Sequence, residues 1–221
     1  MSCTNAGLRA IIRERLTDDA VWTDNNLDQW ILDAIADYSI RFPRTDLEAT
    51  INCVDDQREY DLSSELTNPH SILSVEYPDG EDPPEFLTRR GISDSRGFWG
   101  GEYYAVWGSP PHTLFIGEKP DDGEDVVVRY AGDHLYPTQD SDTLTVPDDH
   151  LEGLVLFVKW KAAEHLLAEE AADPQTTTLL LTQFDMMVYR AGRAYRTWMQ
   201  DAAEKHRRQT SAIVNWEDIG L

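Results

Sequence analysis

The hydrophobic periodicity of the chain changes twice, and this change restricts the possible folds more than any other feature. Apolar residues recur at helical spacing up to about residue 42, and again from about residue 147. Between these segments, short apolar and β-branched runs alternate with turn signals. The 221-residue chain is therefore expected to have helical ends around a β segment.

Two helices are expected before residue 47. Thr4 or Asn5 can cap the first and Thr23 the second, because a side-chain oxygen at this position accepts a bond from a free backbone N–H. The second helix carries a wide apolar stripe and is expected to be well buried. It should end at Phe42, because the residue before Pro43 avoids helical geometry.

Short strands are expected between residues 47 and 146, separated by turn signals such as Asp79-Gly80. No segment in this region is long enough for a crossover helix, so an antiparallel sheet, a small barrel or a sandwich is expected. The expected strands are Leu47–Val54, Glu59–Leu62, Ser71–Tyr77, Glu85–Arg89, Tyr103–Trp107, His112–Gly117 and Val126–Tyr130.

Two more helices are expected after Val146-Pro147, the last running from Gln175–Thr178 to about Arg208. Residues 209–221 lack a helical pattern but are too apolar for an idle tail. They are expected to be an extended segment that binds a partner or folds back on its own domain. The candidate contact residues in this tail are Ile213, Val214, Trp216, Ile219 and Leu221.

These elements predict an α+β fold, in which two N-terminal and two C-terminal helices form an antiparallel bundle with an inserted antiparallel β domain. The helical segments must meet, because neither can bury its apolar stripe alone. The expected divisions are residues 1–46 and 147–208 for the helical domain, 47–146 for the β domain and 209–221 for the tail.

The chain is strongly acidic. Nineteen Lys and Arg against 41 Asp and Glu leave a formal net charge of −22 at pH 7. Such a surface repels DNA phosphates and anionic lipids, so neither sequence-specific DNA binding nor membrane binding is expected. Two explanations for the acidity stay open: adaptation to a high-salt host, or an acidic channel wall to which DNA does not adhere.

The charge is unevenly distributed. Residues 1–185 carry a net charge of −24, whereas residues 186–221 carry +2. Arg190, Arg193 and Arg196 recur every three residues on the last helix, and Arg207 and Arg208 follow. They form a solvated face paired with nearby carboxylates, a surface for an acidic neighbour or a direct contact with DNA. An acidic body and a basic end favour head-to-tail packing of copies.

Motifs for catalysis are absent from the sequence. It has no Gly-rich phosphate loop ending in Lys-Ser or Lys-Thr, no His-Glu-x-x-His, no Cys-x-x-Cys and no Gly-x-Ser-x-Gly. The acidic run 121–125 lacks the spacing of a calcium loop, and Asp148-Asp149 suit a helix N-terminus. His165 is expected to be a core histidine. No enzymatic activity, cofactor or metal is expected, with an Asp- or Glu-dependent hydrolase as the alternative.

Several segments match a known pattern: Leu8–Leu16, Trp22-Thr23-Asp24, Leu27–Ala34 with Tyr38-Ser39, and Leu144–Asp149 leading into a helix. With them, the chain resembles the head-to-tail adaptor proteins of tailed phages, which stack on the portal ring. The β insertion is similar to that of the larger adaptors of short-tailed phages, called tail tubular or gateway proteins. The smaller adaptors lack such an insertion, so the role of residues 47–146 stays open.

The resemblance implies a structural virion protein that forms a ring of about twelve copies below the portal and continues the DNA channel. The implied partners are other copies, the portal protein, a downstream neck or tail protein and non-specifically passing viral DNA, without a membrane. The implied location is the virion neck, after synthesis in the host cytoplasm, and the composition suggests a halophilic host. A stopper or tail-completion protein is the alternative, although such proteins are usually β-dominated.

Overall fold

A computed structural model describes residues 3–16, 22–91, 101–121 and 123–217, and the side chains among these up to residue 208. The chain divides into two compact units. The helical unit consists of Met1–Phe42 together with His134–Leu221, and the β unit is Pro43–Asp133. Helices and sheets are thus segregated along the chain, which confirms the predicted α+β class.

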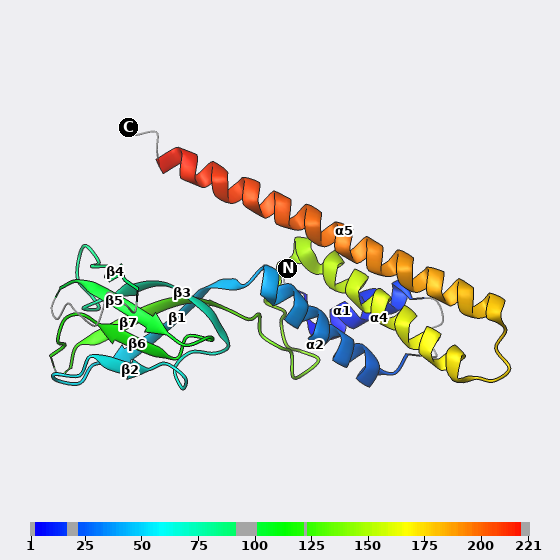
Figure 1. The fold of residues 1–221 in the computed structure, drawn as a ribbon, viewed down its shortest axis with the longest axis horizontal. Coiled ribbons are helices and arrows are strands. Elements are labelled where there is room, and N and C mark those ends of the chain that lie inside the picture. The colour runs from blue at the N-terminus through cyan, green and yellow to red at the C-terminus, as the bar shows by residue number, and fades with distance from the viewer. Residues whose placement is uncertain (1–2, 17–21, 92–100, 122, 218–221) are drawn as a thin grey trace. The chain divides into compact units, whose positions relative to one another are not determined.

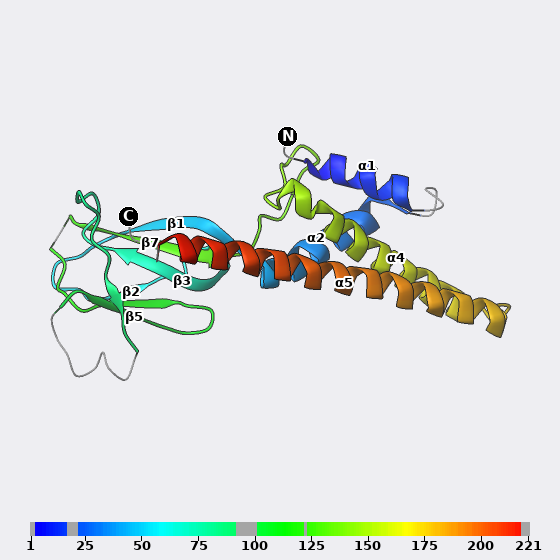
Figure 2. The same cartoon turned by 90° about the horizontal axis from the view of Figure 1, so that it is seen from above.

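The helical unit is built around one central helix. Its elements are α1 (Asn5–Arg15), α2 (Asp24–Arg41), the 3-10 turn η1 (Asp148–His150), α4 (Leu151–Ala172) and α5 (Thr178–Glu217). Helix α4 contacts each of the other three helices, and α5 runs back along it after a short turn (Figures 1 and 2). The N-terminal and C-terminal helices therefore pack into one bundle.

Local sequence explains where the first helices begin. The Thr4 hydroxyl accepts a hydrogen bond from the Gly7 N–H at 3.2 Å, and the Thr23 hydroxyl accepts one from the Asn26 N–H at 3.2 Å. Each threonine satisfies a backbone donor that the helix leaves free. Both predicted N-caps are confirmed, and α2 ends before Phe42-Pro43 as expected.

One core closes the helical unit. It includes Leu8 and Ile12 of α1, Ile31 of α2, and Leu154 and Val158 of α4, all essentially inaccessible to solvent. Burial of these side chains supplies the main favourable free energy of folding. The two ends of the chain are therefore held together by apolar packing.

His134 joins the two places where the chain leaves and re-enters the helical unit. Its backbone N–H donates to the Ser39 hydroxyl at 3.0 Å, and its ring Nε2 donates to the Phe42 carbonyl at 2.9 Å. Ring Nδ1 lies 3.1 Å from the Thr145 hydroxyl. The buried imidazole thus has partners for both of its nitrogens, as buried polar groups require.

The β unit contains two sheets. The first has the order β1-β7-β3 and the second β2-β6-β5-β4. All pairs are antiparallel except the two-residue pair of Thr88–Arg89 with Tyr103–Tyr104, which is parallel, so the predicted purely antiparallel arrangement is wrong at that edge. The strands are β1 (Arg44–Asn52), β2 (Glu59–Asp61), β3 (Pro69–Glu76), β4 (Thr88–Arg89), β5 (Tyr103–Trp107), β6 (Thr113–Ile116) and β7 (Asp125–Gly132).

The two sheets share a core of their own. Ile72 and Val128 of the first sheet pack in one apolar cluster with Tyr104 and Leu114 of the second. This arrangement is a small sandwich, one of the predicted alternatives. The β unit therefore has the separate hydrophobic core that an independent domain requires.

The limits of the β unit differ from the predicted residues 47 and 146. Strand β1 begins at Arg44 and β7 ends at Gly132. The segment after β7 packs on the helices, because Leu144 and Val146 are buried in the helical core and the Leu144 N–H donates to the Cys3 carbonyl at 2.9 Å. Its alternating pattern resembles a strand but reflects packing against α1.

The prediction of an extended tail over residues 209–221 is wrong for residues 209–217. These residues continue α5, which runs for 40 residues to Glu217 instead of ending near Arg208. No proline follows Pro174, and no glycine lies between Gly192 and Gly220, so no residue in between interrupts the helix. Residues 218–221 lie outside the described part of the chain.

Candidate interaction surface

Helices α4 and α5 contact each other through a reciprocal pair of glycine–tryptophan contacts. A Cβ atom on Gly153 of α4 would lie 2.2 Å from Cζ3 of Trp198 on α5. A Cβ atom on Gly192 of α5 would lie 3.1 Å from Nε1 of Trp160 on α4. Each helix therefore accepts an indole ring of the other where it has no side chain, and these contacts fix the register of the pair.

The middle of α5 is anchored by Tyr195. Its ring stacks on Trp160 and meets Phe157 edge-on, with centroids 6.1 and 5.2 Å away. Its hydroxyl donates a hydrogen bond to Asp37 of α2. Burial, followed by the hydrogen bond to this carboxylate, raises the pKa of Tyr195 well above its usual value. The phenol therefore stays protonated and ties α5 to α2.

The N-terminal part of α5 leaves large apolar side chains exposed. Leu179 is 71% exposed, Tyr189 62%, Met186 48% and Met187 46%. Large apolar side chains exposed on one segment make it a candidate site for another molecule.

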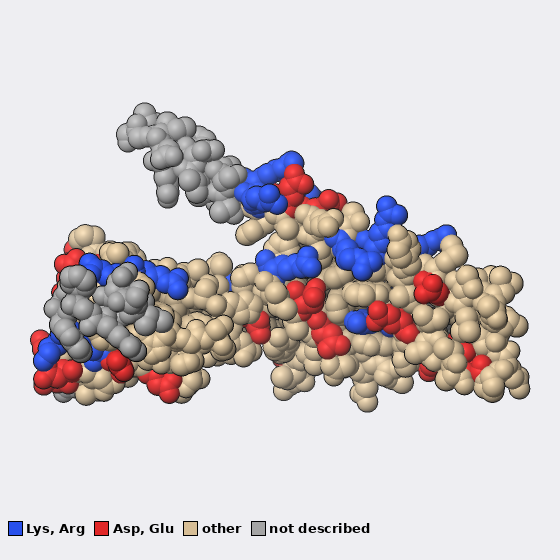
Figure 3. Space-filling view, viewed as in Figure 1, with Lys and Arg blue, Asp and Glu red and all other residues tan. Residues whose placement is uncertain are grey.

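The arginines on α5 have different surroundings. Arg190 and Arg193 are exposed and have no ion-pair partner among the described residues, whereas the Arg196 guanidinium lies 5.9 Å from the Trp160 ring centroid. Arg207 is exposed, and Arg208 pairs with Glu204 one turn away. Lys and Arg side chains gather along α5 in the view of Figure 3. The helix thus combines cationic and apolar surface.

The other predicted contact residues lie at or beyond the end of the described side chains. Ile213, Val214 and Trp216 belong to the helical backbone of α5, but their side chains lie outside the described part. Ile219 and Leu221 lie wholly outside it. Their role in binding a partner therefore stays a prediction.

A groove beside α5 was not expected from the sequence. It has a volume of about 430 Å³ and lies between the end of α1, the start of α2, α4 and α5. It forms where small residues face each other, with Ala162 and Ala163 on α4 and Ala191 and Ala194 on α5. The alanine pairs were the available signal, because they leave space between helices where larger side chains would fill it.

Two of the carboxylates considered for chemistry, Asp148 and Glu124, have structural partners. Asp148 accepts a hydrogen bond from the Cys3 N–H at 3.3 Å, in the turn that leads into α4. Glu124 accepts one from the Asp121 N–H at 3.0 Å and one from the Tyr77 hydroxyl. These bonds hold the pKa of Glu124 below its usual value, the tyrosine bond most strongly. The acidic run 121–125 thus includes a hydrogen-bonded turn.

His165 is not a core residue. Its side chain is 39% exposed, its Nε2 lies 3.3 Å from a carboxylate oxygen of Glu169, and its ring packs against Trp22 and Trp30. The described residues include no group of three or more His, Cys, Asp or Glu side chains arranged to hold a metal ion. In the same part of the chain, no helix combines the length and the apolar character needed to span a bilayer.

Comparison with known proteins places the chain in a family. No curated protein matches its sequence. The family model described as SU10 adaptor protein matches residues 4–215, which includes α1, α2, α4, all but the last two residues of α5, and the whole β unit. The chain therefore belongs to the SU10 adaptor protein family, which confirms the predicted resemblance to the structural head-to-tail adaptors of tailed phages.

Proposed function

We propose that copies of this protein form a closed ring below the portal, joining the virus head to the tail and continuing the channel through which DNA passes. Family membership supports the adaptor role. The observation that carries the ring is the surface of α5, where exposed apolar residues occur beside Arg190 and Arg193, which have no ion-pair partner among the described residues, in a chain that is otherwise strongly acidic.

Charge complementarity favours contact between unlike faces of neighbouring copies. Residues 1–185 carry −24 and residues 186–221 carry +2, so the basic end of one copy is attracted to the acidic body of the next. Contacts between unlike faces close into a ring when the rotation between copies is an integral fraction of a full turn. The ring number follows from that angle, and about twelve copies would match the symmetry implied by the resemblance.

The acidity suits a surface past which DNA must move. Phosphates bind proteins through Lys and Arg, and an excess of carboxylates suppresses this adhesion. No bond is made or broken in this mechanism. The protein would act as a passive conduit in the virion neck, between the portal above and a neck or tail protein below.

Electron microscopy of the purified protein, alone and mixed with the portal protein of the same virus, tests the proposal. We expect rings seated coaxially on the portal, and native mass spectrometry should give one copy number for them. A protein that stays monomeric in both samples, or that forms rings which do not dock on the portal, would refute the adaptor ring. The second result would favour a stopper or tail-completion role.

A further inference from the structure

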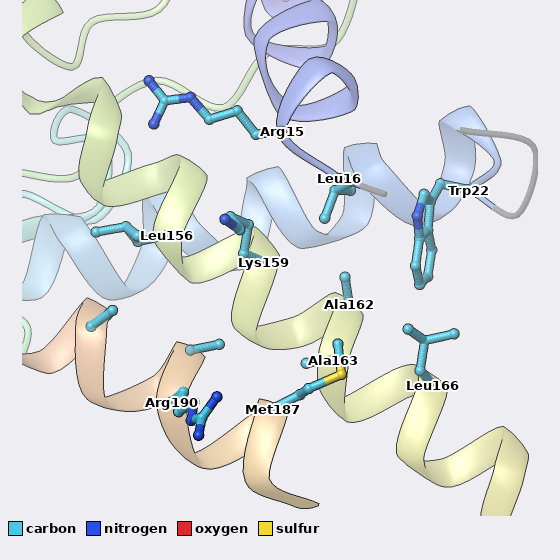
Figure 4. A pocket seen from close by; sticks show the side chains of 12 residues that line it. Arg15, Leu16, Trp22, Leu156, Lys159, Ala162, Ala163, Leu166, Met187 and Arg190 are labelled. Carbon is cyan, nitrogen blue, oxygen red and sulfur yellow. The ribbon is translucent and has the colours of Figure 1, made fainter. Parts of the chain in front are cut away.

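The groove beside α5 has apolar walls and a cationic lining. Figure 4 shows Leu16 and Trp22 on one side of it, α4 along its middle and α5 opposite, with Met187 directed toward Ala163. Trp22 is almost fully buried, and its ring Nε1 has no hydrogen-bond partner among the described residues. The groove therefore offers mainly apolar surface to an occupant.

Among the described residues, three cations and no carboxylate line this groove. Arg15 pairs with Glu152 at 2.7 Å, but Lys159 and Arg190 have no ion-pair partner among the described residues. In a protein with a net charge of −22, a groove lined by cations stands out from the acidic remainder of the chain and attracts carboxylates. It suits an occupant that is apolar and acidic at the same time.

The C-terminal residues 213–219 have this chemistry. Ile213, Val214, Trp216 and Ile219 are apolar, and Glu217 and Asp218 lie among them. A tryptophan followed by two carboxylates matches an apolar groove lined by Lys159 and Arg190. Aromatic anchors of this kind supply much of the affinity at protein interfaces.

The same copy cannot supply this segment to its own groove. Arg190 and Trp216 belong to one uninterrupted helix, and 26 residues at 1.5 Å per residue separate them by about 39 Å. A continuous helix cannot fold back over that distance. The occupant must come from another molecule.

We propose that the C-terminal residues 213–219 of a second copy of the chain bind in this groove, with Trp216 against its apolar wall and Glu217 and Asp218 toward Lys159 and Arg190. This inference rests on the proposed ring, since each copy would give one helix end and receive another. It identifies the receiving site, which the ring alone does not specify.

Photocrosslinking within the full-length protein tests the contact. Trp216 is replaced by benzoylphenylalanine, copies labelled with ¹⁴N and ¹⁵N are mixed, and the sample is irradiated with and without the portal protein. We expect crosslinks between differently labelled copies at Met187 and its groove neighbours. Crosslinks within one copy, crosslinks only to the portal, crosslinks to another surface of the chain, or none at all would overturn the proposal.

A charge swap gives a second measurement. Arg190→Glu should lower the crosslinking yield roughly tenfold, and adding Glu217→Arg with Asp218→Arg should restore it. Lys205→Glu is the matched control, because it reverses an exposed charge on the same helix outside the groove. Equal losses from both reversals, or no loss from Arg190→Glu, would overturn the proposal.

The two proposals can fail separately. Rings whose crosslinks map outside the groove would refute the proposed groove contact but not the proposed adaptor ring. Specific crosslinks in the groove from an assembly that never closes into a ring would support the groove contact and refute the ring.

Discussion

Gly153 and Gly192 differ in how much space the α4–α5 contact leaves for a side chain. A methyl group on Gly153 would overlap the Trp198 ring, whereas one on Gly192 would touch Trp160 at a distance that a small shift can relieve. Alanine also has a higher helix propensity than glycine by about 1 kcal/mol. The steric cost exceeds this gain at the first position and roughly balances it at the second.

Gly153→Ala should therefore destabilise the helical unit by about 1–3 kcal/mol, the usual penalty for overpacking a core. Gly192→Ala should change stability by less than about 1 kcal/mol in either direction. Urea denaturation followed by tryptophan fluorescence measures both. A Gly153→Ala protein as stable as the parent would show that Trp198 does not occupy the space above this glycine.

Asp142 makes the stability of the helical unit depend on pH. Its carboxylate accepts hydrogen bonds from the N–H groups of Thr138 and Gln139 at 2.7 and 2.9 Å and from the Thr138 hydroxyl at 3.0 Å. These bonds, the two from the backbone first, lower the pKa of Asp142 in the folded state. Its stabilising contribution is therefore complete above the unfolded-state pKa of about 3.9 and is lost as the pH falls through the lower folded-state pKa.

Asp142→Asn should be less stable than the parent at pH 5 to 7, and the difference should shrink below about pH 4. Denaturation at a series of pH values measures this difference. Asp185→Asn is the control, since this exposed carboxylate has no hydrogen-bond partner among the described residues. A difference that stays constant down to acid unfolding would mean that Asp142 does not accept these bonds as a carboxylate.

Among the elements, the helices were predicted well, and the ends of elements less well. The caps at Thr4 and Thr23 and the stop at Phe42-Pro43 depend on local chemistry, which the sequence displays directly. Helix α5 continues to Glu217 because no proline or glycine interrupts its C-terminal half, and the irregular apolar pattern of residues 209–217 hides this continuation from sequence analysis. The groove depends on which alanines face each other across two helices, and this is a property of packing that no single segment contains.

Ala212→Pro tests the correction made at the end of α5. Proline removes a backbone donor and clashes with the preceding turn, so it should abolish helical structure around residues 209–217 at a cost of about 3 kcal/mol locally. The Cα chemical shifts of these residues measure helicity, and Ala212→Leu should leave them helical. Shifts that are already non-helical in the parent would restore the extended tail predicted from the sequence.

At the scale of the whole molecule, net charge should make stability depend on salt. A charge of −22 generates repulsion that the folded state concentrates and that ions screen, with a Debye length of about 10 Å at 0.1 M and 3 Å at 1 M salt. The melting temperature should therefore rise by several degrees between about 0.1 and 1 M KCl. Calorimetry measures the rise.

A charge-reduced variant separates screening from general salting-out. Replacing the exposed carboxylates Asp79, Glu81 and Asp82 by amides should weaken the salt response while leaving the apolar surface unchanged. An identical response in both proteins would attribute the salt effect to apolar burial. A flat response in both would favour the channel-wall explanation of the acidity over adaptation to high salt.

The hydrogen bonds of His134 also bear on how this architecture can vary. The exit at Phe42 and the return at His134 are bonded directly to each other, so the helical bundle is sealed at the base of the insertion. This hydrogen bond does not restrict the length of the inserted segment, because the entropic cost of closing a loop grows only slowly with its length. The helical bundle can therefore act as a scaffold, in which residues 43–133 are replaceable by another domain whose termini lie equally close together.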